Sequence, residues 1–345
     1  MKQTHSFDDV LLVPQSSDVR SRSEVDLTRK VSGNKFSLPI MSSPMDTVTE
    51  VDMALSMFRA GGLGIVHRYN TIEHQASLVS EIRDVLEEEQ SSQVHSIAAA
   101  IGASGDFFER AQELYNAGTR IFCIDVAHGH HTLVERAIKE VRAQWGLNAT
   151  IIAGNVATAK GYLDLSEWGA DAVRVGIGGG SICSTRIQTG HGVPTFQSVY
   201  DCKYEDGAAI IADGGIKTAG DIVKSLAAGA DFVMLGSMLA GTEESPGSVH
   251  SASNGKRYKV YRGMASIEAQ VAWRGNARSL EGVSTTIPFK GPVNKILDNL
   301  AMNIKSGLSY TGVRNITQLQ SRCEFITQTT AGRTESGTHI LNRNV

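Results

Sequence analysis

The 345-residue sequence has few cysteines, little proline and no long apolar run. Its four cysteines are scattered and form no CxxC pair, which excludes a disulfide framework. No apolar stretch approaches the ~20 residues of a membrane span, and the N-terminus MKQTHSFDDV lacks the apolar core of a signal peptide. A net charge of −3 gives no basic surface for nucleic acid or membranes. These absences predict a cytoplasmic protein with reduced thiols and with neither nucleic acid nor membrane as a partner.

Glycine, in contrast, is abundant: 35 residues against 7 prolines. This balance suits a protein with many tight exits from strands into loops. With 41% hydrophobic and 20% charged residues, the composition is that of an ordinary globular protein. The length allows either two average domains or one large barrel.

Short apolar runs alternate with amphipathic segments along most of the chain. The runs lie at 36–43, 62–67, 95–103, 120–128, 150–157, 171–178, 208–215 and 231–238. Segments between them, such as 106–118 and 132–146, have apolar residues at helical spacing and end in glycine. Because the runs are almost wholly apolar rather than alternating, they indicate parallel strands buried on both faces.

Eight such units in series predict an α/β fold, a (β/α)8 TIM barrel, which typically takes ~250 residues. A doubly wound sheet is the alternative, but it rarely sustains eight units in order. We expect one catalytic domain over 1–345, with an N-terminal extension and no inserted regulatory domain. The rhythm stops near 250, which predicts a flap or lid over 250–291, then a helix over 292–306 and a polar tail.

Polar and glycine residues gather where the predicted strands end, which is the catalytic face of such a barrel. The segment ADGGIKTAGDIVKSLAAGADFVMLGS (212–237) shows this twice. Asp213 is a natural acceptor for sugar hydroxyls, and the glycines beside it and at Gly236-Ser237 allow backbone N–H groups to cradle a phosphate. The alternative is that these glycines only make tight turns.

The loop GIGGGSICSTR (176–186) adds a cysteine to such a glycine-rich exit. Most cysteines are small buried hydrophobes, and Cys123 inside IFCID fits that interpretation. Cys183, on a polar loop where N–H groups favour a thiolate, is instead a candidate nucleophile. Thr185 beside it offers a hydroxyl that can relay protons. The HGHH cluster at 128–131 has no carboxylate or cysteine partner at ligand spacing, so we expect surface or loop histidines there.

The cysteine loop, with its continuation IQTGHGVP, is similar to that of the inosine-monophosphate dehydrogenase / guanosine-monophosphate reductase family. The likeness extends to FDDVLLVP (7–14), MDTVTE (45–50), GNVAT (154–158), the ADGG segment and YRGM (261–264), and it spans residues 7 to at least 312. It implies that Cys183 attacks C2 of a purine nucleotide and forms a covalent thioimidate, with hydride leaving or arriving at C2.

The resemblance also implies roles for residues around the cysteine. Cys183, Thr185 and Glu281 would be catalytic. Substrate contacts would come from Ser43, Asp213, Gly214, Gly215, Gly236, Ser237, Tyr261, Gly263, Met264, Ala265 and Gly282. Cofactor contacts would come from Arg68, Asp125, Val126, Ala127 and Asn155. Carbonyl oxygens of Gly178, Gly180 and Cys183 would hold a monovalent cation, usually potassium. The family often has Gly or Ser where this chain has Ala265, which weakens one polar contact.

Two features bear on which of the family's reactions the chain catalyses. Dehydrogenases usually carry a pair of cystathionine-synthase-type modules after the second βα unit, where this chain has none. Dehydrogenases also carry an Arg-Tyr pair on a mobile flap that activates water, whereas here Arg274 precedes Gly275 and residues 265–282 have no Tyr. Thr185 and Glu281 remain, a pair similar to the reductase's proton relay.

These features favour NADPH-dependent deamination of guanosine monophosphate (GMP) to inosine monophosphate (IMP) and ammonia. The alternative is an IMP dehydrogenase without regulatory modules, which uses NAD and water. A non-catalytic nucleotide-binding barrel is a third interpretation, but Cys183, Thr185 and Glu281 are all present. The resemblance further implies a homotetramer.

Overall fold

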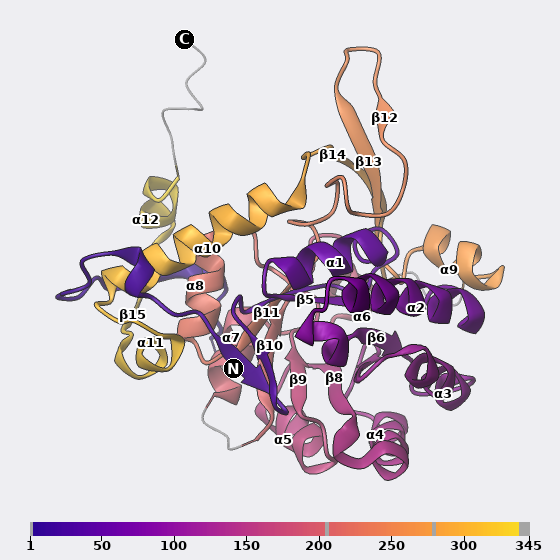
Figure 1. Cartoon of the computed structure of the whole chain (residues 1–345). Coiled ribbons are helices and arrows are strands. Elements are labelled where there is room, and N and C mark those ends of the chain that lie inside the picture. The colour runs from indigo at the N-terminus through magenta and orange to yellow at the C-terminus, as the bar shows by residue number, and fades with distance from the viewer. Residues whose placement is uncertain (1–2, 204–206, 278–280, 338–345) are drawn as a thin grey trace.

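The computed structural model describes residues 3–203, 207–277 and 281–337. Eight parallel strands close into a barrel in the order β10-β11-β4-β5-β6-β7-β8-β9 (Figure 1). The barrel strands are β4 (Ile40–Ser42), β5 (Leu63–Val66), β6 (Ala98–Ile101), β7 (Ile121–Asp125), β8 (Thr150–Val156), β9 (Ala172–Val175), β10 (Ala209–Asp213) and β11 (Phe232–Leu235). Each lies within one of the eight predicted runs, which confirms the (β/α)8 barrel.

Helices surround the strands, and all of those named here except the short α6 bury apolar residues against the core. They are α1 (Val51–Arg59), α2 (Ile72–Glu88), α3 (Phe107–Ala117), α4 (Thr132–Trp145), α5 (Ala159–Glu167), α6 (Thr185–Thr189), α7 (Thr195–Cys202), α8 (Ala219–Ala227) and α10 (Val293–Tyr310). Gly118 ends α3 and Gly146 ends α4, both at positive φ, as the sequence predicted. Helix α10 packs against both α8 and α1 and so completes the ring.

The lower end of the barrel is closed by a hairpin of β2 (Arg29–Val31) and β3 (Asn34–Phe36). The Asn34 amide donates to Thr150, the first residue of β8, at 3.0 Å. It also accepts from Ser96, just before β6, at 2.8 Å. These contacts lie at the N-terminal ends of the strands, the face that serves stability in such barrels.

A three-stranded antiparallel sheet projects from the opposite end as a long arm (Figure 1). It consists of β12 (His250–Ser251), β13 (Arg257–Arg262) and β14 (Ser284–Pro288), with helix α9 (Ile267–Arg274) between the last two strands. The predicted flap over 250–291 thus contains regular structure. Residues 278–280 of that flap lie outside the described residues.

The prediction of a polar tail after 306 was wrong. Helix α10 continues to Tyr310, and α11 (Ile316–Arg322), β15 (Phe325–Thr327) and α12 (Thr330–Glu335) follow. Strand β15 pairs antiparallel with β1 (Val10–Leu12), so both ends of the described chain meet on one side of the barrel. The segment is too short and too polar for periodicity to reveal a strand whose partner lies three hundred residues away. Four short 3-10 turns complete the structure: Phe7–Asp9, Arg22–Glu24, Ser92–Ser96 and Gly146–Asn148.

Candidate active site

A cavity of about 270 Å³ opens at the C-terminal ends of the barrel strands. Every residue that the sequence assigned to catalysis, substrate, cofactor or cation lines this one cavity. Barrel closure explains the assembly, because parallel strands all deliver their following loops to the same rim. The geometry brings these side chains together, while the role of each one stays a prediction.

The Cys183 thiol begins a short chain of hydrogen bonds. Its Sγ donates to the Thr185 hydroxyl at 3.2 Å, and that hydroxyl donates to Glu281 Oε2 at 2.9 Å. The direction of donation leads from the thiol to the carboxylate. A proton released by Cys183 therefore has a defined route to Glu281, and the same route can return a proton to a leaving group.

Backbone pairing brings Glu281 to the cysteine loop. Cys183 and Gly282 form an antiparallel bridge. The Ser184 N–H donates to the Glu281 carbonyl at 3.0 Å, and the Val283 N–H donates to the Ile182 carbonyl at 3.1 Å. The end of the flap is thereby fixed against the loop that carries Cys183, across 96 residues of sequence between Thr185 and Glu281.

A buried arginine links two carboxylates across the cavity. Arg174, on β9, donates to Asp125 Oδ1 at 2.5 Å and to Asp213 Oδ2 at 2.8 Å, and its side chain is 7% exposed. Burial disfavours the guanidinium charge, but Asp213, Cys123 and Asp125 outweigh burial and hold the pKa of Arg174 well above its ordinary value. Asn155 also donates to Asp213 Oδ2, at 2.8 Å. Both aspartates are therefore held in place as hydrogen-bond acceptors.

Sequence reasoning missed Arg174, although a signal was present. It is the one charged residue among the four of β9, AVRV, which is otherwise apolar and buried. A charge in such a strand is found almost only where it is paired. The aspartates that pair it stand 49 and 39 residues away, so spacing alone could not identify them.

The opposite end of the cavity is rich in backbone donors. Gly214 and Gly215 have φ of +88° and +78°, a conformation that strains other residues, and they follow β10 directly. Tyr261 closes this end, with its hydroxyl hydrogen-bonded to Ser181 and Ser237, and burial raises its pKa. Behind Ser237, the Lys290 ammonium donates to its carbonyl oxygen at 2.5 Å. This end fits the predicted phosphate cradle.

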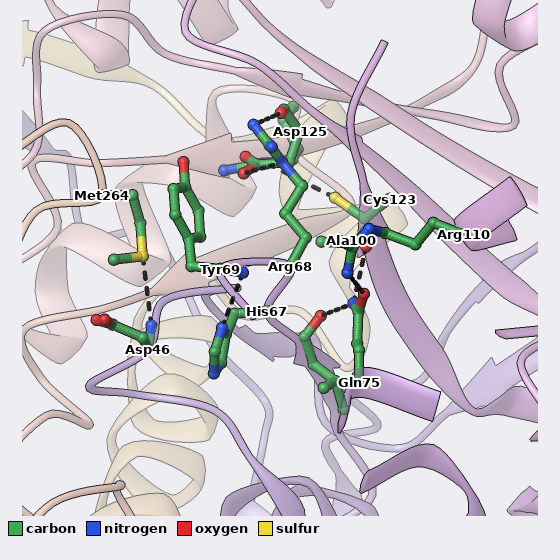
Figure 2. A network of polar contacts seen from close by, with 12 residues as sticks. Asp46, His67, Arg68, Tyr69, Gln75, Ala100, Arg110, Cys123, Asp125 and Met264 are labelled. Atoms are coloured by element: carbon green, nitrogen blue, oxygen red, sulfur yellow. Dashed lines mark hydrogen bonds and ion pairs between the residues drawn. The ribbon is translucent and has the colours of Figure 1, made fainter. Parts of the chain in front are cut away.

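An ion pair positions Met264 at the cavity wall. Asp46 accepts from Arg262 Nε at 2.9 Å. The Asp46 N–H donates to the Met264 sulfur at 3.3 Å, as Figure 2 shows. Met264 is thus tied to the loop after β4. A flexible thioether of this kind suits the face of a planar ring.

Arg68 borders the cavity near Asp125. Its guanidinium donates to the Asp125 carbonyl at 3.0 Å, and its Nε lies 3.8 Å from Asp125 Oδ2 (Figure 2). Tyr69, the next residue, lines the cavity too but was not among the predicted site residues. Nothing in its sequence context distinguished it from an ordinary loop tyrosine.

The histidine cluster lies near this rim. His128 and His131 are exposed, as expected, and burial with nearby histidines lowers the pKa of His128. His130 is half-buried and has a carboxylate partner that spacing did not reveal, because its Nε2 lies 2.6 Å from Asp164 Oδ2. In the part of the chain that the structure describes, no group of three or more His, Cys, Asp or Glu residues is placed to hold a metal ion. Among the same described residues, no helix has both the length and the apolar composition of a membrane span.

Together these features define a barrel with the makings of an enzyme site: around one cavity lie a cysteine hydrogen-bonded through a threonine to a glutamate, and two acceptor carboxylates. The model of the IMP dehydrogenase / GMP reductase domain matches residues 4–339, and the chain belongs to this family. It is 35% identical to inosine-5'-monophosphate dehydrogenase of Nitrosopumilus maritimus, over 98% of each protein. It is 32% identical to GMP reductase of Leishmania major, over 98% of this chain and 97% of that protein.

A solved structure shows the same fold. A cysteine-to-alanine variant of GMP reductase from Trypanosoma brucei, in complex with guanosine 5'-monophosphate, superposes with a TM-score of 0.91 at 30% identity over 98% of both chains. The chain is therefore similar to both kinds of enzyme in the family at closely similar identity.

Chain length does not separate the two reactions. The alignments run over 470 positions for the Nitrosopumilus dehydrogenase and 478 for the Leishmania reductase, against 345 residues here. Both relatives therefore carry residues with no counterpart in this chain. The missing modules, which the sequence argument counted toward the reductase, do not discriminate.

Proposed function

We propose that this protein is a GMP reductase, which converts GMP to IMP and ammonia with NADPH. The observation that carries the proposal is the hydrogen-bonded chain Cys183–Thr185–Glu281, since it supplies the proton that expulsion of ammonia requires. The flap supports it, because residues 265–282 contain no tyrosine to activate water.

The hydrogen-bonded chain Cys183–Thr185–Glu281 defines the order in which a proton would move during the reaction. As Cys183 Sγ bonds to C2 of GMP, the thiol proton passes through Thr185 to Glu281. Glu281 then returns a proton by the same route to the 2-amino group, which leaves as ammonia. When C2 receives a hydride, the C–S bond breaks and Cys183 leaves as a thiolate. The dinucleotide, when bound, supplies that hydride.

The cofactor half of the cavity fits a nicotinamide nucleotide. Asp125 ends β7 with a carboxylate that Arg174 orients, and carboxylates accept hydrogen bonds from ribose hydroxyls. Val126, Ala127, Asn155 and Arg68 line the same part of the wall. We extend the proposal to potassium on the carbonyls of Gly178, Gly180 and Cys183. The homotetramer stays a prediction.

IMP dehydrogenation is the second candidate, and one observation favours it. Arg68 and Tyr69 form an adjacent Arg-Tyr pair that lines the cavity, although from a different loop than the flap. Burial, with Asp125 and Asp46 nearby, raises the pKa of Tyr69 to about 12. The Arg68 guanidinium is engaged by Asp125. A phenol that stays protonated is a poor base for water, so we favour the reductase.

A steady-state assay tests the choice. GMP with NADPH, and separately IMP with NAD, are followed at 340 nm beside an ammonia assay. We expect stoichiometric ammonia and NADPH oxidation from the first pair. Glu281→Gln should slow ammonia release more than hydride transfer, with Glu324→Gln as a control carboxylate outside the cavity. Sustained NAD reduction without ammonia would establish the dehydrogenase instead.

A further inference from the structure

Tyr69 lines the cavity between the residues assigned to the purine and those assigned to the cofactor ribose. It follows β5, whose exit loop carries His67, Arg68 and Tyr69 in succession. In Figure 2 its ring stands between Met264 and Arg68, with the hydroxyl pointing away from His67. Burial and, to a lesser degree, the nearby carboxylates of Asp125 and Asp46 raise the pKa of its hydroxyl.

The tyrosine is held by contacts from several sides. Its backbone N–H donates to His67 Nδ1 at 3.1 Å, and the buried His67 ring lies 3.0 Å from Glu50 through its other nitrogen. The Arg68 guanidinium lies 5.0 Å from the Tyr69 ring centroid. The indole of Trp273, on α9, meets the ring edge-on at 4.9 Å. Such contacts are each worth about 1 kcal/mol and fix a ring in place.

The hydroxyl of this fixed ring has no hydrogen-bond partner among the residues that the structure describes. Burial raises its pKa to about 12, so it is a neutral group that can donate one proton and accept another. A half-buried hydroxyl aimed into a cavity without a protein partner is available to a ligand.

The position of Tyr69 indicates which part of a bound ligand its hydroxyl would contact. A nicotinamide ring that transfers hydride to C2 must lie between Met264 and Asp125, where the purine and ribose contacts are proposed. Its one polar substituent is an uncharged carboxamide, which a neutral phenol suits. A phosphate would call for cations instead.

We propose that the Tyr69 hydroxyl hydrogen-bonds the carboxamide of the nicotinamide ring, and that Trp273 holds Tyr69 in place for this contact. The inference rests on the proposed function only in requiring a pyridine dinucleotide, so it holds for either direction of hydride transfer. A fixed carboxamide fixes the rotation of the ring and thereby the distance from its C4 to the purine C2.

Binding without turnover tests the contact directly. In a Cys183→Ala background saturated with GMP, Tyr69→Phe should weaken NADPH binding about threefold to tenfold, the worth of one neutral hydrogen bond. The affinity for 2'-phospho-ADP-ribose, which lacks the nicotinamide, should not change. Tyr310→Phe is the matched control, because that ring is 65% exposed on α10 and lies outside the cavity.

Three results would overturn the proposal: unchanged NADPH affinity, an equal loss for 2'-phospho-ADP-ribose, or a loss of GMP affinity. The second would mean that Tyr69 only shapes the wall, and the third that it contacts the purine. Repeating the titration with IMP and NAD separates this proposal from the reaction itself. A dehydrogenase would release no ammonia and would still show the Tyr69→Phe effect.

Discussion

At the scale of single residues, the Cys183 thiol is distinguished by its surroundings. It donates to Thr185 in an open cavity, whereas Cys123 is fully buried in the barrel and burial raises its pKa to about 12. Cys323 is half-buried and donates to the Ala227 carbonyl at 3.3 Å. Reactivity follows from access and proton transfer, so one thiol of these three is suited to attack.

Cys183→Ala should abolish turnover and leave GMP binding within about tenfold, because the contacts to phosphate and ribose are untouched. Cys323→Ala, a thiol outside the cavity, should keep both. Calorimetric titration with GMP and the rate of NADPH oxidation measure the two effects. Substantial turnover by the Cys183 variant would remove it from the mechanism.

Arg174 is expected to affect stability, because it pairs with two carboxylates inside the barrel. Arg174→Gln should lower the free energy of unfolding by about 3–5 kcal/mol, as expected when one partner of a buried ion pair is removed. Urea denaturation measures the loss. Arg136→Gln, in an exposed pair with Glu140, is the control and should cost less than about 1 kcal/mol. If both variants lost the same free energy of unfolding, the ion pairs of Arg174 with Asp125 and Asp213 would not be what stabilises the barrel.

At the scale of elements, the antiparallel pair β1–β15 anchors the C-terminal segment to helix α7. Phe325 meets Phe196 of α7 edge-on at 5.0 Å, and Phe196 in turn contacts Phe7 at 6.0 Å. Aromatic clusters of this kind stabilise beyond the area they bury. The pair therefore links both ends of the described chain to α7.

Phe325→Ala should reduce the free energy of unfolding by about 2 kcal/mol, less than for a fully buried phenylalanine because the ring is half-buried. Ile326, its neighbour in β15, is 47% exposed, and Ile326→Ala should cost under about 1 kcal/mol. Thermal denaturation of both variants compares them. If the two losses were equal, the cluster would not be what holds β15.

The glycine loop is a second element with its own test. Gly178 has φ of +81°, and the Gly180 carbonyl accepts from the Cys183 N–H at 3.1 Å, which leaves it a second lone pair for a cation. Activity should rise severalfold when potassium replaces tetramethylammonium at constant ionic strength. An unchanged rate would exclude a cation on these carbonyls.

Elements of the barrel could be predicted because each strand is apolar on both faces and each helix carries one stripe. The β1–β15 pair could not, since three-residue strands have no period to detect and their pairing is non-local. For a related reason, the strands of the β12–β14 arm were not predicted within the expected flap or lid over 250–291. These strands are largely exposed: β12 is exposed throughout, β14 has no buried residue, and in β13 only Lys259 and Tyr261 are buried.

At the scale of the whole molecule, the site depends on segments that only the closed barrel brings together. The likeness of motifs could name Cys183, Thr185 and Glu281, but not their order of hydrogen bonds. That order follows from the bridge between Cys183 and Gly282. Arg174 and Tyr69 escaped prediction because their partners come from other strands and from α9.

Residues 265–282 contain no tyrosine to activate water, and this should separate the two reactions kinetically over the complete catalytic cycle. A thioimidate made from IMP needs activated water, and positioned general-base help is worth typically 10²–10⁴-fold. Tyr69 lines the cavity, but burial raises its pKa to about 12, so it supplies almost no base at neutral pH. IMP and NAD should therefore give at most one hydride per active site rapidly and then stall, because the adduct persists.

Stopped-flow absorbance at 340 nm measures the burst, and its amplitude is compared with the concentration of active sites. GMP and NADPH under the same conditions should turn over continuously, since ammonia leaves with a proton from Thr185 and Glu281 rather than by attack of water. Raising the pH should shorten the stall, because hydroxide replaces the missing base. A dehydrogenase would instead continue past the first turnover at neutral pH without a lag, and the water it uses would then need a base that lies elsewhere in the cavity.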